Sequence, residues 1–511
     1  MIVLTTTCKG NPGPLQITQS RSFLLMLLSA RKTAYKKLLR ILGCAVFPCV
    51  IFSAVQGQAL KARVTVSSSF PAEIQILAES SSPVSSWSFR NAYAGVLGLG
   101  DRIQRFDAPD RLREMMPVHK IAAGEFRSEN KVTTFSYIVK LLPPPRASDM
   151  SHVSWLAGES GFLMLADLLP QAEEATANQG VLLEFELPAG WSVGSSLVPN
   201  EKNEYLVMEP DKAVFFVSRS LRKTVKTVDA MKTQLLASGE WTFADADVLK
   251  AATTVLKKYF ELTGFKLRES SVVMLAPLPA SAGNDQWRAE TRGATVMLLL
   301  NPRVSRKNWI AQLAVIFTHE IFHLWVPNSL SLEGDYDWFF EGFTLYEALL
   351  TALDLKLITF QGFLDTIARV YDSYLSYPDS LSLIEASEQR WTSSVPLVYD
   401  KGMLVAFMYD LTARRESNSK NSLSDRYRVL FNSHAEHANS NEVIVSLLRT
   451  SPATNDFPGV YIESRAGIKL ERFLPAFGLE VDASGQGTRL IVSKQLSEQQ
   501  HRLLRSLGYR H

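Results

Sequence analysis

Two histidines and a glutamate fall within five consecutive residues, in the order His319-Glu320-Ile321-Phe322-His323. Residues four apart share one face of a helix, so the two imidazoles would project toward one point. Two imidazoles at this spacing can bind one zinc ion, with the Glu320 carboxylate beside a water molecule on the metal. The motif therefore predicts a zinc site in which Glu320 is the base that takes a proton from that water.

The chain around this motif is apolar on nearly every side of the expected helix, residues 305–325. Such a helix is expected to be buried. Burying two histidines and a glutamate without partners would cost several kcal/mol each, in order of magnitude, and a bound metal ion removes that cost. The alternative is an ordinary core helix with hydrogen-bonded histidines, which leaves three ionisable groups within five residues to be explained.

A third metal ligand is expected from the segment Asp337 to Glu347. Glu341 stands 18 positions after His323, on a second expected helix, and Pro327 and Asn328 between the two helices permit a return loop. Two histidines and one glutamate leave a fourth position for water, as a catalytic zinc site requires. Glu347 is expected either to face inward and orient a ligand histidine or to lie at the surface.

The first part of the chain reads as an all-β domain, residues 60–235, in the form of a sandwich. Short runs rich in β-branched and aromatic residues are separated by Pro, Gly, Ser and Asn turns. The expected strands are 61–66, 73–77, 135–141, 180–187 and 212–218.

The pattern changes near Trp241. A helix is expected over 244–263, then two strands over 271–278 and 295–301. After the zinc-motif helix the expected helices are 338–355, 360–377, 398–415, 423–431 and 442–448. The fold class is therefore α+β and multidomain, with a mostly helical catalytic domain over 236–455 and a short C-terminal segment, 456–511.

Residues 1–59 are expected to be a leader that contains a signal peptide. They hold seven basic residues and no acidic one, so removing them changes the net charge of the chain from +3 to −4. A basic stretch precedes the short uncharged run 41–55, and small residues allow cleavage after Gly57 or Ala59. Export to the periplasm or the medium is the expectation, and a membrane anchor through residues 41–55 is the alternative. Because the basic charge lies in the leader, nucleic-acid binding is not expected.

Cysteine use agrees with processing. The three cysteines are Cys8, Cys44 and Cys49, all within the leader. The mature chain would have neither a disulfide nor a thiolate metal ligand.

Several segments resemble the glycyl aminopeptidase family of gluzincin zinc metallopeptidases. They are His319–Trp325, Trp338–Tyr346, Tyr399-Asp400-Lys401-Gly402 with the helix that follows, and Trp87–Gly95. The resemblance covers about residues 59–481. It implies a thermolysin-like catalytic domain, one zinc ion per chain, and a peptide or protein substrate. The family usually ends in a PDZ domain, and the residues after Val481 are too few for one.

The resemblance also assigns roles to single residues. It implies that His319, His323 and Glu341 hold the zinc ion, that Glu320 is the general base, and that the Tyr399 hydroxyl stabilises the oxyanion. A sixth residue, Glu290, matches the family's ligand for the substrate's free amino group. The family surrounds that glutamate with glycines and a following histidine, whereas Trp287, Arg288 and Thr291 stand here.

Three functions stay open at this point. An exported zinc aminopeptidase is the leading hypothesis. A zinc endopeptidase of the same fold, with Glu290 as a structural partner of Arg288 or Arg292, is the second. A catalytically silent binding protein is the third, and the presence of both Glu320 and Tyr399 speaks against it, since packing demands neither.

Overall fold

The computed structural model describes residues 58–510, except 69, 71, 110–114, 172–179, 230, 269, 283–286, 379, 434–436 and 483–486. Apart from residues 58 and 59, the expected leader lies outside these described residues. Within them, no helix combines the length and the apolar character that crossing a membrane requires.

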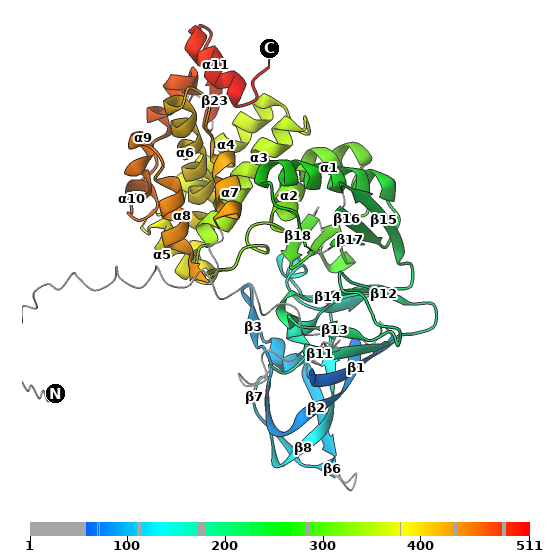
Figure 1. Cartoon of the computed structure of the whole chain (residues 1–511). Coiled ribbons are helices and arrows are strands. Elements are labelled where there is room, and N and C mark those ends of the chain that lie inside the picture. The colour runs from blue at the N-terminus through cyan, green and yellow to red at the C-terminus, as the bar shows by residue number, and fades with distance from the viewer. Residues whose placement is uncertain are drawn as a thin grey trace, which may run out of the picture. The chain divides into compact units, whose positions relative to one another are not determined.

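An eight-stranded sheet forms the first part of the described chain (Figure 1). Alternation places Ala62, Val64 and Val66 in the core and Arg63 outside, which is the period of a half-buried strand. In spatial order the strands are β13 (Tyr205–Val207), β11 (Gly180–Glu186), β1 (Gln58–Ser68), β2 (Glu73–Ser88), β8 (Glu125–Lys140), β5 (Ile103–Pro109) and β6 (Met115–Met116), and β7 (Val118–Ala122) also pairs with β8. A small hairpin, β3 (Ala92–Tyr93) and β4 (Val96–Leu97), follows β2.

A four-stranded sheet packs against the first, which gives the expected sandwich. Its order is β12 (Ser192–Gly194), β14 (Val214–Ser218), β10 (Ser160–Met164) and β9 (Trp155–Ala157). Every residue of β14 is buried, because both faces of this strand are covered. Phe215 and Val217 pack into the core shared with β1 and β2. Val214 and Phe216 pack into a second core, shared with Leu236 and Met274 of the next sheet.

That next sheet has five strands of mixed direction. Its order is β15 (Arg222–Val228), β16 (Met231–Ala237), β17 (Ser271–Pro277), β19 (Thr295–Leu300) and β18 (Trp287–Arg292), with β16, β17 and β19 parallel. Helix α1 (Asp245–Thr263) connects β16 to β17, and its Val248, Val255 and Tyr259 pack on the sheet side of the core, as expected. The predicted boundary after residue 235 falls inside β16 and stays a prediction.

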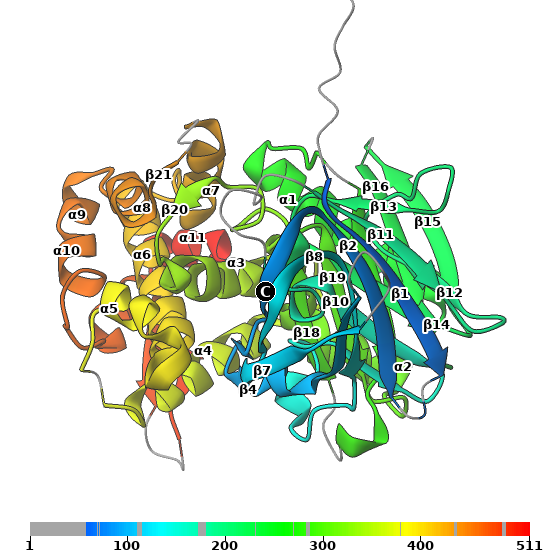
Figure 2. The same cartoon turned by 90° about the horizontal axis from the view of Figure 1, so that it is seen from below.

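The rest of the chain is mainly helical. In Figures 1 and 2, helices α4, α6 and α8 gather at one side and strands β1, β2 and β8 at the other. The helices are α2 (Arg306–Phe322), the π-helical turn η7 (Trp338–Phe343), α3 (Thr344–Asp354), α4 (Phe360–Leu375), α5 (Leu383–Glu388), the π-helical turns η8 (Arg390–Ser394) and η9 (Leu397–Lys401), α6 (Gly402–Glu416), α7 (Leu423–Asn432) and α8 (Ser440–Leu448). The all-β part followed by this region confirms the predicted α+β class.

The C-terminal segment belongs to the same hydrophobic core as the helices. Leu474, Leu490 and Leu503 are buried in the core that contains α2, α3 and α6. Its elements are α9 (Pro452–Asn455), α10 (Phe457–Tyr461), the short 3₁₀ turns η10 (Leu470–Arg472) and η11 (Leu474–Phe477), the hairpin β22 (Leu479–Asp482) and β23 (Arg489–Val492), and α11 (Glu498–Ser506).

Two glycines bring the helices of the site into backbone contact. A methyl group added to Gly342 in η7 would lie 2.5 Å from the Cα atom of Gly402 in α6. One added to Gly402 would lie 2.9 Å from the carbonyl oxygen of Trp338. Only glycine permits so close an approach, and it fixes η7, which carries Glu341, against the chain that follows Tyr399.

Candidate metal centre and active site

Helix α2 carries His319, and His323 follows its last residue on the same face. Both imidazoles are buried, with His319 only 4% and His323 only 7% exposed. The backbone N–H of His323 still donates to the carbonyl of His319 at 3.2 Å, so the helical register that pairs the two rings is kept to the end of α2. Their Nε2 atoms lie 3.1 Å apart.

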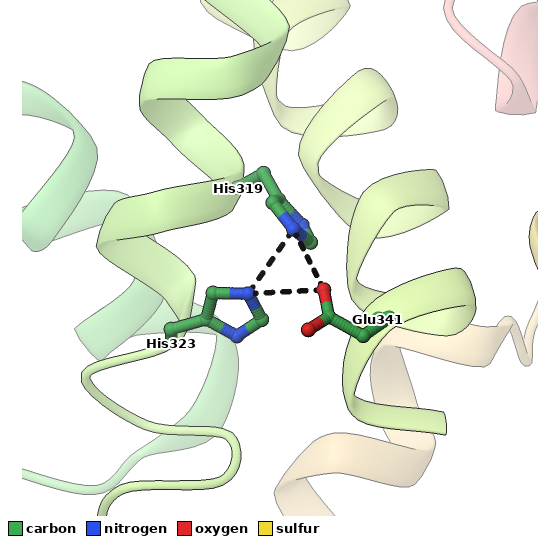
Figure 3. Close-up of side chains that lie close together, drawn as sticks. All are labelled: His319, His323 and Glu341. Atoms are coloured by element: carbon green, nitrogen blue, oxygen red, sulfur yellow. Dashed lines mark hydrogen bonds and ion pairs between the residues drawn. The ribbon is translucent and has the colours of Figure 1, made fainter. Parts of the chain in front are cut away.

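Glu341 completes the cluster from the facing π-helical turn η7 (Figure 3). Its Oε2 atom lies 3.2 Å from Nε2 of His319 and 3.4 Å from Nε2 of His323. A tetrahedral ion with bonds of about 2.0–2.1 Å to nitrogen and oxygen holds its ligand atoms about 3.3 Å apart. The three atoms, all buried and within 4.8 Å of one another, therefore fit a single zinc ion and leave one position free.

Each histidine has a partner at the nitrogen that faces away from the cluster. Nδ1 of His323 lies 2.8 Å from the carbonyl oxygen of Val326, and only a protonated nitrogen can donate there. Nδ1 of His319 lies 3.3 Å from Oγ1 of Thr344, whose own proton goes to the carbonyl of Phe340 at 2.6 Å. Protonation at Nδ1 leaves both Nε2 lone pairs for a metal ion. Sequence reasoning missed Thr344, although it stands three residues after Glu341 on the same helical face.

The Glu320 carboxylate is held by a strand of the five-stranded sheet. Oγ1 of Thr291, in the edge strand β18, lies 2.8 Å from Oε2 of Glu320 and 2.8 Å from its backbone carbonyl oxygen. Burial raises the pKa of Glu320 above its ordinary value, against the pull of His323 and His319. A carboxylate with a raised pKa is a better proton acceptor than a solvated one, which suits the role of a base.

Tyr399 lies at the other side of Glu341, in the π-helical turn η9. Its hydroxyl oxygen is 2.9 Å from an Nη atom of Arg390, which also donates to Oε1 of Glu341 at 2.7 Å. Burial raises the pKa of Tyr399 well above its ordinary value, so the phenol keeps its proton. Tyr399 can therefore act as a hydrogen-bond donor.

Arg390 is another site residue that the sequence did not reveal. Besides Glu341 and Tyr399 it pairs with Asp337, and its side chain is only 12% exposed. Burial alone would raise the pKa of Glu341, but Arg390 and His323 outweigh it and hold that pKa well below the ordinary range. No periodicity or motif marks an arginine nine positions before a tyrosine.

Glu290 lies in β18 next to Thr291, and both of its oxygens are engaged. Oε1 accepts from Nε of Arg292 at 2.6 Å and from the hydroxyl of Tyr93 at 3.4 Å. Oε2 pairs with Nδ1 of His152. Neighbouring residues of a strand point to opposite faces, so Thr291 faces Glu320 while Glu290 faces Tyr93 and His152. The ion pair with Arg292, one of the two that the structural alternative for Glu290 named, is present, and the amine-binding role stays a prediction.

Glu347 faces inward, as one of its two expectations had it, but it does not orient a ligand histidine. It is buried in α3, only 2% exposed, and its two oxygens accept from the hydroxyl of Ser424 at 3.0 and 2.8 Å. The outer partner of His319 is Thr344 instead. Burial raises the pKa of Glu347 to about 7.

The raised pKa of Glu347 predicts a specific dependence of stability on pH. The unfolded chain, with an ordinary carboxyl pKa near 4.3, loses this proton first as pH rises, so wild-type stability falls between about pH 4.5 and 7 and is constant above. The cost at pH 8 is at most about 4 kcal/mol. The free energy of unfolding of Glu347→Gln, relative to that of the wild type, should therefore be larger at pH 8 than at pH 5. Urea unfolding of both proteins at the two pH values measures this. An identical difference at both pH values would contradict the buried, protonated Glu347.

Comparison with known proteins gives structural likeness alone. No family model matches the sequence, and no curated protein matches it either. Among solved structures, an aminopeptidase N family protein from Idiomarina loihiensis is similar with a TM-score of 0.70 and 17% identity, over 86% of this chain and 82% of that one. An M1 zinc metallopeptidase from Deinococcus radiodurans is similar with a TM-score of 0.50 and 13% identity, over 81% and 95%. A variant of an M1 zinc metallopeptidase from the same organism, bound to a Tyr-Ser-Ala substrate, gives the same values. The chain therefore has the fold of these M1 zinc metallopeptidases.

Proposed function

We propose that this chain is a zinc-dependent peptidase that removes residues from the amino end of peptides. The observation that carries the proposal is the convergence of His319, His323 and Glu341 on one point, with Glu320 and Tyr399 beside them. The similar folds belong to proteins described as an aminopeptidase N family member and as zinc metallopeptidases, one of them with a tripeptide substrate. A silent binding protein would need neither the base nor the phenol.

Each residue has a definite task in this proposal. Zinc in the cluster would supply Lewis acidity, bringing the pKa of a water molecule near ~7. Glu320, positioned by Thr291, takes the proton from the attacking water and later delivers it to the leaving amine. Tyr399 donates its hydroxyl proton to the developing oxyanion, a contact whose loss costs about 3 kcal/mol in comparable sites.

Glu290 decides between two kinds of peptidase. An aminopeptidase needs a carboxylate for the substrate's ammonium group, which is the proposed role of Glu290. Its pairing with Arg292 and His152 already neutralises that carboxylate, and this favours an endopeptidase as the second candidate function.

Two substrate sets test the proposal directly. Zinc-loaded protein should hydrolyse aminoacyl reporters and leave amino-acetylated, internally quenched peptides intact. Glu290→Gln should then lower kcat/KM for free-amine substrates about tenfold or more, since an ammonium–carboxylate pair is lost. If the blocked peptides are hydrolysed as fast as the aminoacyl reporters, the endopeptidase is favoured. If neither set is hydrolysed, the proposed peptidase function is wrong.

We further propose that the chain is exported, on the basis of the basic stretch, short apolar run and small residues before Leu60. The mature protein should begin near Gln58 or Leu60. Amino-terminal sequencing of exported material tests this, and a start before Ile41 would contradict cleavage.

A further inference from the structure

The guanidinium group of Arg390 joins two parts of the site that lie on different elements. One of its Nη atoms donates to Oε1 of Glu341 at 2.7 Å and to the hydroxyl oxygen of Tyr399 at 2.9 Å. Its other Nη atom pairs with Asp337. Glu341 comes from η7, Tyr399 from η9 and Arg390 from η8. The same cation therefore contacts the third metal ligand and the expected oxyanion donor.

We propose that Arg390 is a positioning residue that sets both the metal-binding oxygen of Glu341 and the direction of the Tyr399 hydroxyl. This inference deepens the proposed function and rests on it for the catalytic part.

The first consequence concerns Glu341. A carboxylate can bind a metal ion through either oxygen or both. Here Oε1 is taken by Arg390, whereas Oε2 faces the two histidine Nε2 atoms at 3.2 and 3.4 Å. Arg390 thus leaves one oxygen for the metal ion. A one-oxygen ligand keeps the coordination number low and preserves the position that a catalytic site needs.

The second consequence concerns Tyr399. A guanidinium group has only donors and cannot accept a hydrogen bond. At 2.9 Å the hydroxyl oxygen of Tyr399 must therefore be the acceptor from Arg390. Its proton therefore points away from Arg390, and in this structure it goes to the Glu341 carboxylate. A substrate oxygen would take the place of that carboxylate as the acceptor. A phenol oxygen that accepts from a cation is also a stronger donor through its own proton.

The guanidinium group is held in place by its surroundings. Its central carbon lies 4.4 Å from the ring centre of Trp391 and 5.6 Å from that of Phe340, within the range of cation–π attraction. Asp337 supplies a second carboxylate beside Glu341, so the buried cation is compensated. Two carboxylates and two rings fix the orientation that a flexible lysine could not reproduce.

The test is Arg390→Lys, which keeps the charge and removes the planar two-way donor. The zinc dissociation constant, measured by chelator competition without substrate, should rise about 10- to 100-fold, as for loss of other outer partners of metal ligands. At saturating zinc, kcat should fall about tenfold or more with KM little changed. The effect of Arg390→Lys on kcat should largely disappear in the Tyr399→Phe background, because both changes act on one contact.

The matched control is Arg414→Lys. Arg414 is equally buried, 11% exposed, and pairs with the buried Asp410 at 2.7 Å, and its other contact is the carbonyl of Ser506. Zinc affinity and kcat should stay at wild-type values there. If Arg390→Lys fails to fold, Asp337→Asn, which loosens Arg390 without touching a ligand, should still weaken zinc binding.

The outcomes separate the two proposals. If Arg390→Lys binds zinc as tightly as the wild type, the positioning role is wrong, even if the wild type is an active peptidase. Where the lysine variant does not fold, wild-type zinc affinity in Asp337→Asn has the same meaning. Independent effects of Arg390→Lys and Tyr399→Phe on kcat would overturn its catalytic part. A wild type that binds zinc tightly but cleaves no peptide would refute the proposed function, while the affinity measurement would still decide the role of Arg390 toward Glu341.

Discussion

Glu320→Gln should lower peptide turnover at least ~100-fold and leave zinc content unchanged. Glutamine has the size of glutamate, and its amide oxygen can still accept from Oγ1 of Thr291, which lies 2.8 Å from the carboxylate. What the variant lacks is a group that can take a proton at neutral pH. Turnover at saturating substrate, together with metal analysis and circular dichroism, would check the expectation.

The chain offers a matched control in Glu347→Gln. Glu347 is another buried carboxylate on a helix of the same region that accepts from a hydroxyl group, Ser424, yet it has no contact with the metal-ligand atoms. Its replacement should leave turnover near the wild-type value. Near-normal activity of Glu320→Gln would show that the hydrolytic mechanism proposed here is wrong, even with zinc bound.

His319→Ala and His323→Ala should each abolish zinc retention. Either change removes one of three protein ligands and leaves at most two, which do not hold zinc against dialysis. It also leaves Glu341, which lies 3.2 Å from His319 and 3.4 Å from His323, without one of its partners. Metal analysis after dialysis measures the loss, and purified wild type should retain about one zinc ion per chain.

His437→Ala is the control for this second prediction, because the His437 side chain is 80% exposed and pairs with Glu333 at the surface. It should retain zinc in full. Glu341→Gln should weaken zinc binding without removing it, since the amide oxygen of glutamine remains as a weaker, uncharged third ligand beside both histidines. Stoichiometric zinc in both histidine variants would disprove the site.

Local patterns predicted the elements that carry strong hydrophobic periodicity. The expected helix 244–263 is α1 to within one residue, and 423–431 is α7. The expected strands 271–278 and 295–301 contain β17 and β19. These segments bury one face or both, so their sequences show the period of the element.

Strands β15, β16 and β18 of the five-stranded sheet were not predicted, and for β15 and β18 there is a physical reason. Both are edge strands of the five-stranded sheet, and β15 is almost wholly exposed or half-buried with two lysines among its seven residues. An edge strand needs few apolar residues, because its order comes from hydrogen bonds to a neighbour that is distant in sequence. The failure to predict β18 had the largest effect on the predicted site, since β18 carries Thr291, the residue that contacts Glu320.

The residues of the site also fall into a group that local patterns predicted and a group that they did not. His319, His323 and Glu320 follow from spacing along one helix, and the position of Glu341 followed from a second helix and a family resemblance. Thr291 and Arg390 reach the site through hydrogen bonds to Glu320 and Glu341, which stand 29 and 49 positions away in the chain. One hydrogen bond between distant residues leaves no pattern in a single sequence.

The contact between Gly342 and Gly402 has a mechanical consequence. The two helical segments meet at main-chain atoms, so their separation is set by van der Waals radii and not by the rotamers of intervening side chains. Warming populates other rotamers, but it cannot push these backbones closer or open a gap without disturbing the packed core around them. The distance between the Glu341 segment and the Tyr399 segment should therefore change little with temperature, because it is fixed by backbone contact.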